Sequence, residues 1–250
     1  NEVTMVRPNV SLIDLFTTVS MGMPGFEWEV SRIRSYTIIV SLFEYPMSAT
    51  AKGDFVLLSS WFTGTVQLID RKTNKTVEML HGFKAPHDAV RLSDGSILVN
   101  ELGTKSLVRA SGEHGKDRKT IASDLAGPVG LVAANDNTAY VTEAFAGLVS
   151  KIDIASGAKS VVAKDLKGPE GIALAPDGKL IVAEVGARRV ISIDPQTGAV
   201  TELAGNLPIG LAGAAGTLPT NIPTGVGVGA SGTIYVSSDI ENAVYTLKKK

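Results

Sequence analysis

The stretch GPEGIALAPDGKLIVAE at residues 168–184 decides the fold, because the chain repeats its pattern several times. Related copies begin at residues 44, 85, 127 and 222, and the first of them is the weakest. Each copy has a proline near its start, and these prolines are spaced by 40, 42, 41 and 54 residues: Pro46, Pro86, Pro128, Pro169 and Pro223. A unit of about 41 residues therefore organises most of the chain, and only the last interval contains an insertion.

Residue types within the unit predict strands. Short β-rich runs at residues 138–142, 180–183 and 233–237 are too brief for helices, and turn pairs such as Asp94-Gly95, Asp177-Gly178 and Ser231-Gly232 precede such runs. A third run, at residues 190–194, ends in a second turn, and a fourth, at 199–204, completes an antiparallel meander. Helical HEAT repeats have a similar period of roughly 40 residues, but these residue types favour the four-stranded blade of a β-propeller.

The two ends of the chain determine the predicted number of blades. Residues 29–33 echo residues 148–152, and residues 37–43 follow them as the fourth strand of an earlier unit, which makes six units. The last copy stops after its third strand, so we expect a strand within residues 3–16 to complete that blade and hide its edge. The sequence thus predicts a single all-β domain over residues 1–250, a six-bladed propeller of four-stranded antiparallel blades. Residues 1–45 hold a partial first blade and the closing strand, and residues 46–250 hold five readable blades.

Composition limits the classes of partner. The chain has 24 Lys and Arg against 25 Asp and Glu, a formal charge of −1, so it has no net field to attract nucleic acid or an anionic membrane. It has no Cys and therefore no disulfide or thiolate chemistry, which leaves the redox compartment open. Its longest mostly apolar run, residues 36–43, is far shorter than the roughly 20 residues of a membrane-spanning helix. Because the chain begins at Asn1 without a Met, we expect a processed or truncated start, and we favour an extracellular or periplasmic location.

Two of the repeat lines carry a family resemblance. GPEGIALAPDGKLIVAE at residues 168–184 and IPTGVGVGASGTIYVSSD at residues 222–239 resemble the superfamily of six-bladed propellers. That superfamily includes NHL-repeat proteins, strictosidine-synthase-like proteins and the senescence-marker-protein/gluconolactonase family, and the likeness covers about residues 44–250. Its members include lactonases, phosphotriesterases, lyases and binding domains, so activity must be argued from the site.

One face of the predicted propeller should hold that site. In a meandering blade, the start of the innermost strand, the end of the second strand and the fourth-to-first connection lie on the same face. The residues that follow the marker prolines then form a ring near the axis: Met47, His87, Val129, Glu170 and Thr224.

The resemblance implies a metal at this ring, because the gluconolactonase family typically offers Glu, Asn and Asp oxygens to a divalent cation there. Glu44 in Glu-Tyr-Pro resembles the family's Glu-x-Pro ligand, and Glu170 in Pro-Glu-Gly resembles its Pro-Asp-Gly ligand. Such carboxylates suit a hard cation such as Ca²⁺. Val129, however, stands where the family pattern has an Asn ligand.

Three functions remain open. The first is metal-assisted hydrolysis of a small lactone or ester, with Glu44 or Glu170 accepting a proton and His87 as an alternative base. The second is a non-catalytic, NHL-like propeller that binds a small ligand or a protein partner. The third is a strictosidine-synthase-like lyase or synthase, which would need a base such as Glu170 or His87 and no metal.

A second regular set of carboxylates lies at matching ends of the second strands, at spacings of 42 and 41 residues: Glu101, Glu143 and Glu184. These residues could line the mouth of the funnel and attract cations. Alternatively, each one stabilises its own turn, and we favour this second interpretation because side-chain bonds to the backbone commonly stabilise loops. The insertion, residues 206–222, lies in a fourth-to-first connection and is expected to lean over the same face, as a lid, as an apolar patch or as a tolerated loop.

Overall fold

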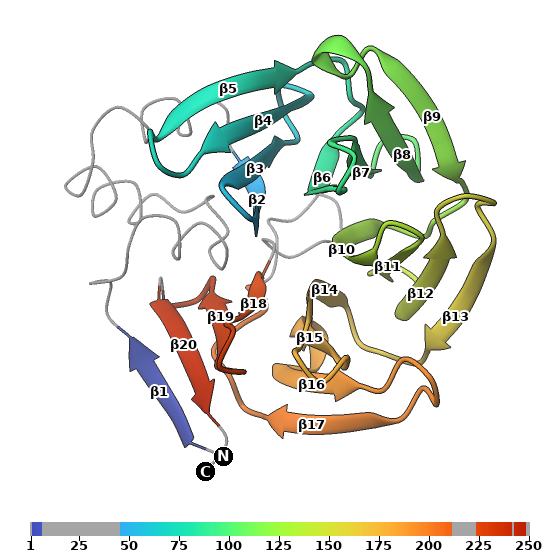
Figure 1. Cartoon of the computed structure of the whole chain (residues 1–250). Coiled ribbons are helices and arrows are strands. Elements are labelled where there is room, and N and C mark those ends of the chain that lie inside the picture. Colours follow the sequence, from blue (N-terminus) through green and yellow to red (C-terminus); the bar gives the residue numbers. More distant parts are fainter. Residues whose placement is uncertain (1, 7–45, 212–223, 242, 249–250) are drawn as a thin grey trace.

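The protein is a β-propeller of four-stranded antiparallel blades. The computed structural model describes residues 2–6, 46–211, 224–241 and 243–248. Five blades follow one another around a centre, and the first strand of each blade lies innermost (Figure 1).

Two blades come from the first half of the described chain. The first consists of β2 (Pro46–Lys52), β3 (Phe55–Ser60), β4 (Thr65–Asp70) and β5 (Lys75–Leu80). The second consists of β6 (Pro86–Arg91), β7 (Ile97–Glu101), β8 (Ser106–Ser111) and β9 (Asp117–Ala122). A 3₁₀ turn, η1 (Glu113–Gly115), connects β8 to β9.

The remaining three blades repeat the same plan. The third consists of β10 (Pro128–Asn135), β11 (Thr138–Glu143), β12 (Leu148–Asp153) and β13 (Lys159–Ala163). The fourth consists of β14 (Pro169–Leu174), β15 (Leu180–Glu184), β16 (Arg189–Ile193) and β17 (Val200–Ala204), with the 3₁₀ turn η2 (Val185–Ala187) between β15 and β16. The fifth consists of β18 (Val226–Val228), β19 (Ile234–Ser238), β20 (Ala243–Lys248) and the N-terminal β1 (Glu2–Val6).

The N-terminal strand completes the last blade, as the sequence predicts. β1 pairs antiparallel with β20, and Thr4 lies opposite Thr246 in that register. The pairing gives β20 a neighbour on both sides, so its backbone groups are not left as an open edge. Residues from the two ends of the chain thus share one sheet (Figure 1).

The number of blades differs from the sequence prediction, because the structure describes five blades and not six. The residues predicted to form the additional blade, 29–33 and 37–43, lie outside the described residues. The repeat unit itself is confirmed, since each blade from Pro46 onward begins its first strand at or just after a marker proline.

The core consists of apolar layers between neighbouring blades. Leu98 and Leu107 of the second blade pack with Leu131 and Val141 of the third, and all four side chains are almost completely buried. Similar layers join the first blade to the second, the third to the fourth and the fourth to the fifth. Because both sides of an interior blade face other sheets, its strands are apolar on both sides rather than strictly alternating.

We distinguish two faces of the propeller. The ring face carries the loops between second and third strands (61–64, 102–105, 144–147, 185–188 and 239–241) and the connections between blades (81–85, 123–127, 164–168 and 205–211). The turn face carries the turns between first and second strands and between third and fourth strands. No helix within the described residues is long and apolar enough to cross a membrane.

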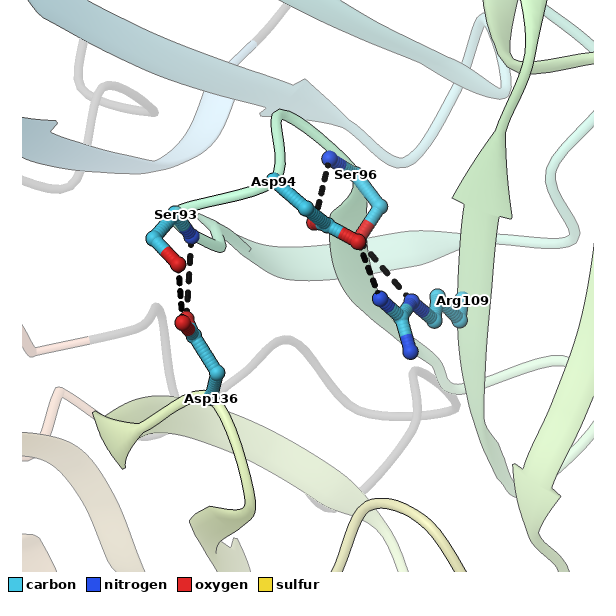
Figure 2. Close-up of polar contacts among 5 residues, drawn as sticks. All are labelled: Ser93, Asp94, Ser96, Arg109 and Asp136. Atoms are coloured by element: carbon cyan, nitrogen blue, oxygen red, sulfur yellow. Dashed lines mark hydrogen bonds and ion pairs between the residues drawn. The ribbon is translucent and has the colours of Figure 1, made fainter.

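Polar side chains connect the turns of the turn face to one another. Figure 2 shows Ser93 donating to Asp136 of the next blade through both its backbone N–H and its hydroxyl. It also shows Asp94 accepting from the Ser96 hydroxyl at 2.6 Å and pairing with Arg109. The hydroxyl of Ser96 lowers the pKa of Asp94, and the hydroxyl of Ser93 lowers the pKa of Asp136. Both carboxylates are therefore ionised at neutral pH, and the turn face is a closed polar surface.

Two glycines allow a matched test of the backbone. Gly147 has φ +64°, and a Cβ there would lie 2.2 Å from the Leu166 carbonyl oxygen, whereas Gly178 has φ +83° with no atom within 4 Å of its Cβ position. Gly178→Ala should lower the free energy of unfolding by about 1–2 kcal/mol through backbone strain alone. Gly147→Ala should cost about 2 kcal/mol more, because a backbone atom must also move. Urea unfolding of both variants measures the difference, and equal losses would contradict the close approach.

Candidate functional site

The ring predicted from the marker prolines exists, and its described members are buried. His87, Val129, Glu170 and Thr224 have exposed fractions of 3%, 3%, 2% and 1%. Met47 is half-buried in β2, and Glu44 lies outside the described residues. Ring members on adjacent inner strands pair: His87 Nδ1 lies 3.1 Å from the Val129 carbonyl oxygen, and the Thr224 N–H donates to Glu170 Oε2 at 2.7 Å.

His87 is neutral in this setting. Burial lowers its pKa to about 4, although the contact with the Val129 carbonyl favours the charged form. Since a carbonyl oxygen can only accept, Nδ1 must carry the proton, which leaves Nε2 as the unprotonated nitrogen. His87 can therefore accept a hydrogen bond at Nε2, but its low pKa makes it a weak base at neutral pH.

Glu170 has the opposite shift. Burial raises its pKa to about 8, the Thr224 N–H opposes that rise, and the negative charge of Asp239 adds to it. The carboxyl is therefore mainly protonated at pH 7 and gains or loses its proton just above neutrality. The adjacent Thr224 hydroxyl is buried, and its interaction with the carboxyl also opposes the rise. A buried carboxyl with a raised pKa beside a buried hydroxyl is typical of a functional site.

Asp88, the residue after His87, connects three blades. Its carboxylate accepts from the Ser48 hydroxyl at 2.7 Å and the Thr50 hydroxyl at 3.1 Å in the first blade, and from the Leu131 N–H at 2.9 Å in the third. The Ala89 N–H of its own strand donates to it as well. Burial raises the pKa of Asp88 to about 6 against the effect of these four donors, so the group is ionised at pH 7.

His87 and Asp88 are neighbours in the chain but bind different partners. No role for Asp88 was predicted from the sequence. One feature of the sequence could have identified Asp88. It lies two residues after the marker proline Pro86, and at the same distance from their marker prolines the next three blades have Gly130, Gly171 and Gly225. A Cβ at Gly130 or Gly171 would lie 2.3 Å from the Glu170 carbonyl oxygen or 2.5 Å from the Thr224 carbonyl oxygen, so the third and fourth blades have no room for a carboxylate there.

Asp88→Asn should lower the free energy of unfolding by about 1–3 kcal/mol, because an amide NH₂ replaces an acceptor oxygen that faces buried donors. Asp177→Asn, on an exposed turn, is the control and should change the free energy of unfolding by less than about 0.5 kcal/mol.

The folded-state pKa of Asp88 is raised from 3.8 to about 6, so the stabilisation from its protonated form is present below pH 4 and is lost as the pH rises to about 6. Urea unfolding should therefore show a larger wild-type advantage over Asp88→Asn at the acid end of that window than at pH 7. A constant difference would contradict the raised pKa.

Three polar side chains bind the inner strand of the next blade. The Ser59 hydroxyl donates to the His87 carbonyl, the Asn100 amide to the Gly130 carbonyl, and the Thr142 hydroxyl to the Glu170 carbonyl, at 2.7, 3.0 and 2.7 Å. The sequence analysis missed these residues. Their signal is the repeat itself, because they are spaced by 41 and 42 residues on the second strands.

Glu101, Glu143 and Glu184 stabilise loops and do not line a funnel. Each carboxylate accepts the backbone N–H of the residue 17 positions earlier, in the connection that leads into its own blade: Lys84, Ala126 and Lys167, at 3.0, 2.7 and 2.8 Å. Glu143 and Glu184 also pair with Lys159 and Arg189. Their exposed fractions of 7%, 1% and 1% leave little surface for a cation at the mouth of the propeller. These contacts are of the kind that the favoured interpretation expects, in which each carboxylate stabilises a loop of its own blade.

Asp239 has a similar role at the insertion. Its two carboxylate oxygens accept the N–H groups of Gly210 and Leu211 at 2.9 and 2.6 Å, at the start of the predicted insertion. Glu170 holds the N–H of Thr224, just after its end. Two buried carboxylates thus bind the two described ends of this connection, and residues 212–223 between them lie outside the described part.

The described residues do not fit the expected calcium site. They contain no group of three His, Asp or Glu side chains that could hold a metal ion. Val129 offers no side-chain oxygen, and one oxygen of Glu170 already accepts from Thr224. The expected ligand Glu44 lies outside the described residues.

Comparison with known proteins supports the fold. No family model matches the chain, and no curated protein matches it either. Solved structures that resemble it are β-propellers. The WD40 β-propeller domain of Doa1 has a TM-score of 0.64 and 19% identity, with 82% of this chain and 64% of that chain covered, so this chain spans less than two thirds of its length.

Two further structures show the same likeness. A nidogen/laminin complex gives a TM-score of 0.68 at 13% identity over 81% of this chain and 75% of that one. A virginiamycin B lyase from Staphylococcus aureus, crystallised with quinupristin, has a TM-score of 0.57 and 16% identity, with 83% of this chain and 81% of that chain covered. At these identities the likeness concerns the fold alone, because one fold carries many functions.

Proposed function

We propose that this propeller is a hydrolase of a small lactone or ester, and that Glu170 at the axial ring is its general base. The observation that carries the proposal is the buried Glu170 carboxyl, whose pKa is raised to about 8. General acid–base catalysis works best when the pKa of the group lies near the working pH. Glu170 meets this condition, whereas His87, with a pKa of about 4, does not.

The proposed step balances with one water molecule. Ionised Glu170 accepts a proton from water, and the hydroxide forms a bond to the ester carbonyl carbon. The tetrahedral intermediate collapses with cleavage of the acyl C–O bond, and Glu170 returns the proton to the departing alkoxide. The Thr224 hydroxyl, which is buried beside Glu170, is a donor that can stabilise the oxyanion.

Glu170→Gln should reduce kcat/KM on the best substrate of a lactone and ester panel by about 100-fold or more. Glu184→Gln is the matched control, since Glu184 is a buried carboxylate of the same blade that ends β15, binds a loop N–H and does not belong to the ring. For the wild type, kcat/KM should rise with pH, reach half its maximum near pH 8 and level off about one pH unit higher, because the ionised form of Glu170 is the base. A rate that falls over this range, or a Glu170→Gln variant as active as the control, would refute the role of Glu170.

A divalent cation remains a proposal for the same site, based on the resemblance of Glu44 and Glu170 to metal ligands. The same assay tests it by adding a chelator and then Ca²⁺. If activity is lost with the chelator and restored by Ca²⁺, the cation takes part; if activity persists, Glu170 acts without it.

The pairing within the ring favours one alternative, a non-catalytic propeller. His87 forms a hydrogen bond with the Val129 carbonyl, and Glu170 forms one with the Thr224 N–H. Side chains with a purely structural role would make the same bonds. Under this alternative, a small ligand or a protein binds without turnover. A lyase would use the same base but release an unsaturated product, so mass analysis of the products distinguishes hydrolysis from elimination.

A further inference from the structure

The exposed large apolar side chains of the described residues are unevenly distributed. Three of these seven lie on the outermost strands, namely Val77, Val161 and Val200. The other four all lie on the ring face: Phe62, Phe145, Leu211 and Ile240. Among the described residues, the turn face has none, and polar contacts such as those of Ser93 and Asp94 cover it instead (Figure 2). Single exposed apolar residues are ordinary, but their restriction to one face indicates an interaction surface.

These apolar residues alternate with glycine from blade to blade. Phe62, Phe145 and Ile240 occupy the second position after the end of the second strand in blades one, three and five. The same position is Gly103 in blade two and Gly186 in blade four. Phe62 and Phe145 are exposed by 75% and 46%, and Trp61 stacks on Phe62 at a centroid distance of 5.9 Å.

The two blades that have glycine at this position carry basic side chains beside it. Blade two has Lys84 and Lys105, and blade four has Lys167 and Arg188, at equivalent places in the repeat. All four are exposed, and none forms an ion pair with another described residue. The third blade has Ala126 and Gly147 at these two places. Apolar and basic sectors thus alternate around the face.

The ring face carries a few further charged residues besides these four basic side chains. Lys164 adds to the basic side, and the exposed acidic residues of the described loops are Asp124, Asp165 and Glu241, whereas Asp239 is buried. Asp124 and Asp165 lie four residues before the marker prolines, whereas Lys84 and Lys167 lie two residues before them. The hydroxyl of Tyr245 donates to Glu241.

The loops that present these side chains are rigidly connected. The N–H groups of Gly103, Phe145 and Gly186 donate to carbonyls of the preceding connection at 3.0, 3.1 and 2.9 Å. The carbonyls of Lys105, Gly147 and Arg188 accept from the following connection at 2.9, 3.0 and 2.9 Å. The anchoring carboxylates Glu101, Glu143 and Glu184 add a third bond per loop. A surface ordered before binding loses little conformational entropy on association.

We propose that the ring face is a docking surface for an acidic segment of a partner protein whose sequence alternates carboxylates with aromatic or aliphatic residues. Carboxylates of the segment pair with the basic sectors, where Arg188 offers a planar fork for bidentate contact. Its apolar side chains pack on Phe62, Phe145 and Ile240, the residue types that contribute most to binding at interfaces. The charges that face it are unpaired in the free protein, so pairing them does not break existing ion pairs.

The test selects short random peptides displayed on phage against the intact chain. Selected peptides should be rich in Asp and Glu together with Phe, Trp or Leu, and fluorescence anisotropy should show binding that weakens with added salt. The double variant Lys105→Glu with Arg188→Glu should bind them about tenfold or more weakly, and Phe145→Ala should do the same. These changes leave Glu170 and the ring intact, so lactone hydrolysis should not change in step with peptide binding.

Matched controls lie on the outermost strands, where Lys75→Glu with Lys119→Glu reverses the same number of charges and Val161→Ala removes an equally exposed apolar side chain. Thermal unfolding verifies that every variant is folded. The proposal is overturned if no peptides are enriched, if the selected peptides are basic, or if the ring-face and control variants bind them equally. It is also overturned if phosphatidylserine vesicles bind through Lys105 and Arg188 while no peptide does, because the surface would then serve a membrane.

Discussion

Each blade has an innermost strand that is hydrogen-bonded to a neighbour on one side only, and this is the constraint on which the rest of the structure depends. The open edge of that strand faces the axis and its residues, such as His87 and Glu170, are buried, so its backbone groups need other partners. Side chains of neighbouring blades provide them. Ser59, Asn100 and Thr142 each donate to a carbonyl of the next inner strand, and Asp88 accepts the N–H of Leu131. The blades are therefore joined by specific polar bonds as well as by the apolar layers between them.

The same constraint explains where polar and charged residues accumulate. A carboxylate that reaches buried backbone donors is stable away from water, and the structure uses carboxylates in this way at Asp88, Glu143, Glu184 and Asp239. Glu170 differs because burial raises its pKa to about 8 while a single backbone N–H opposes that rise. Glu101, Glu143 and Glu184 therefore hold loops, whereas Glu170 at the ring is suited to proton transfer.

The two faces of the propeller differ in which side chains remain exposed. On the turn face, side chains such as Asp94 and Asp136 are occupied by neighbouring turns, which leaves a polar surface without exposed large apolar groups among the described residues (Figure 2). On the ring face, backbone hydrogen bonds and three buried carboxylates hold the loops together, so side chains such as Phe145 and Arg188 remain available. The proposed reaction and the proposed docking surface share this face but use different residues, because the ring lies at the strand starts and the exposed side chains lie in the loops.

The sequence by itself determined the repeat, the four-stranded blade, the closure of the last blade by an N-terminal strand and the identity of the ring residues. These features follow from local patterns that recur, namely strand alternation, turn residues and marker prolines, and recurrence makes them readable without coordinates. Only the tertiary structure decided what Asp88 and the three glutamates do, because the Leu131 N–H that Asp88 accepts lies 43 residues away and the loop N–H groups that the glutamates accept lie 17 residues away. The type of residue does not reveal which donor it meets. Burial was also decided in three dimensions: the same residue type is a loop anchor at Glu184 and a proton carrier candidate at Glu170, since the number of donors around each carboxylate depends on how neighbouring blades pack.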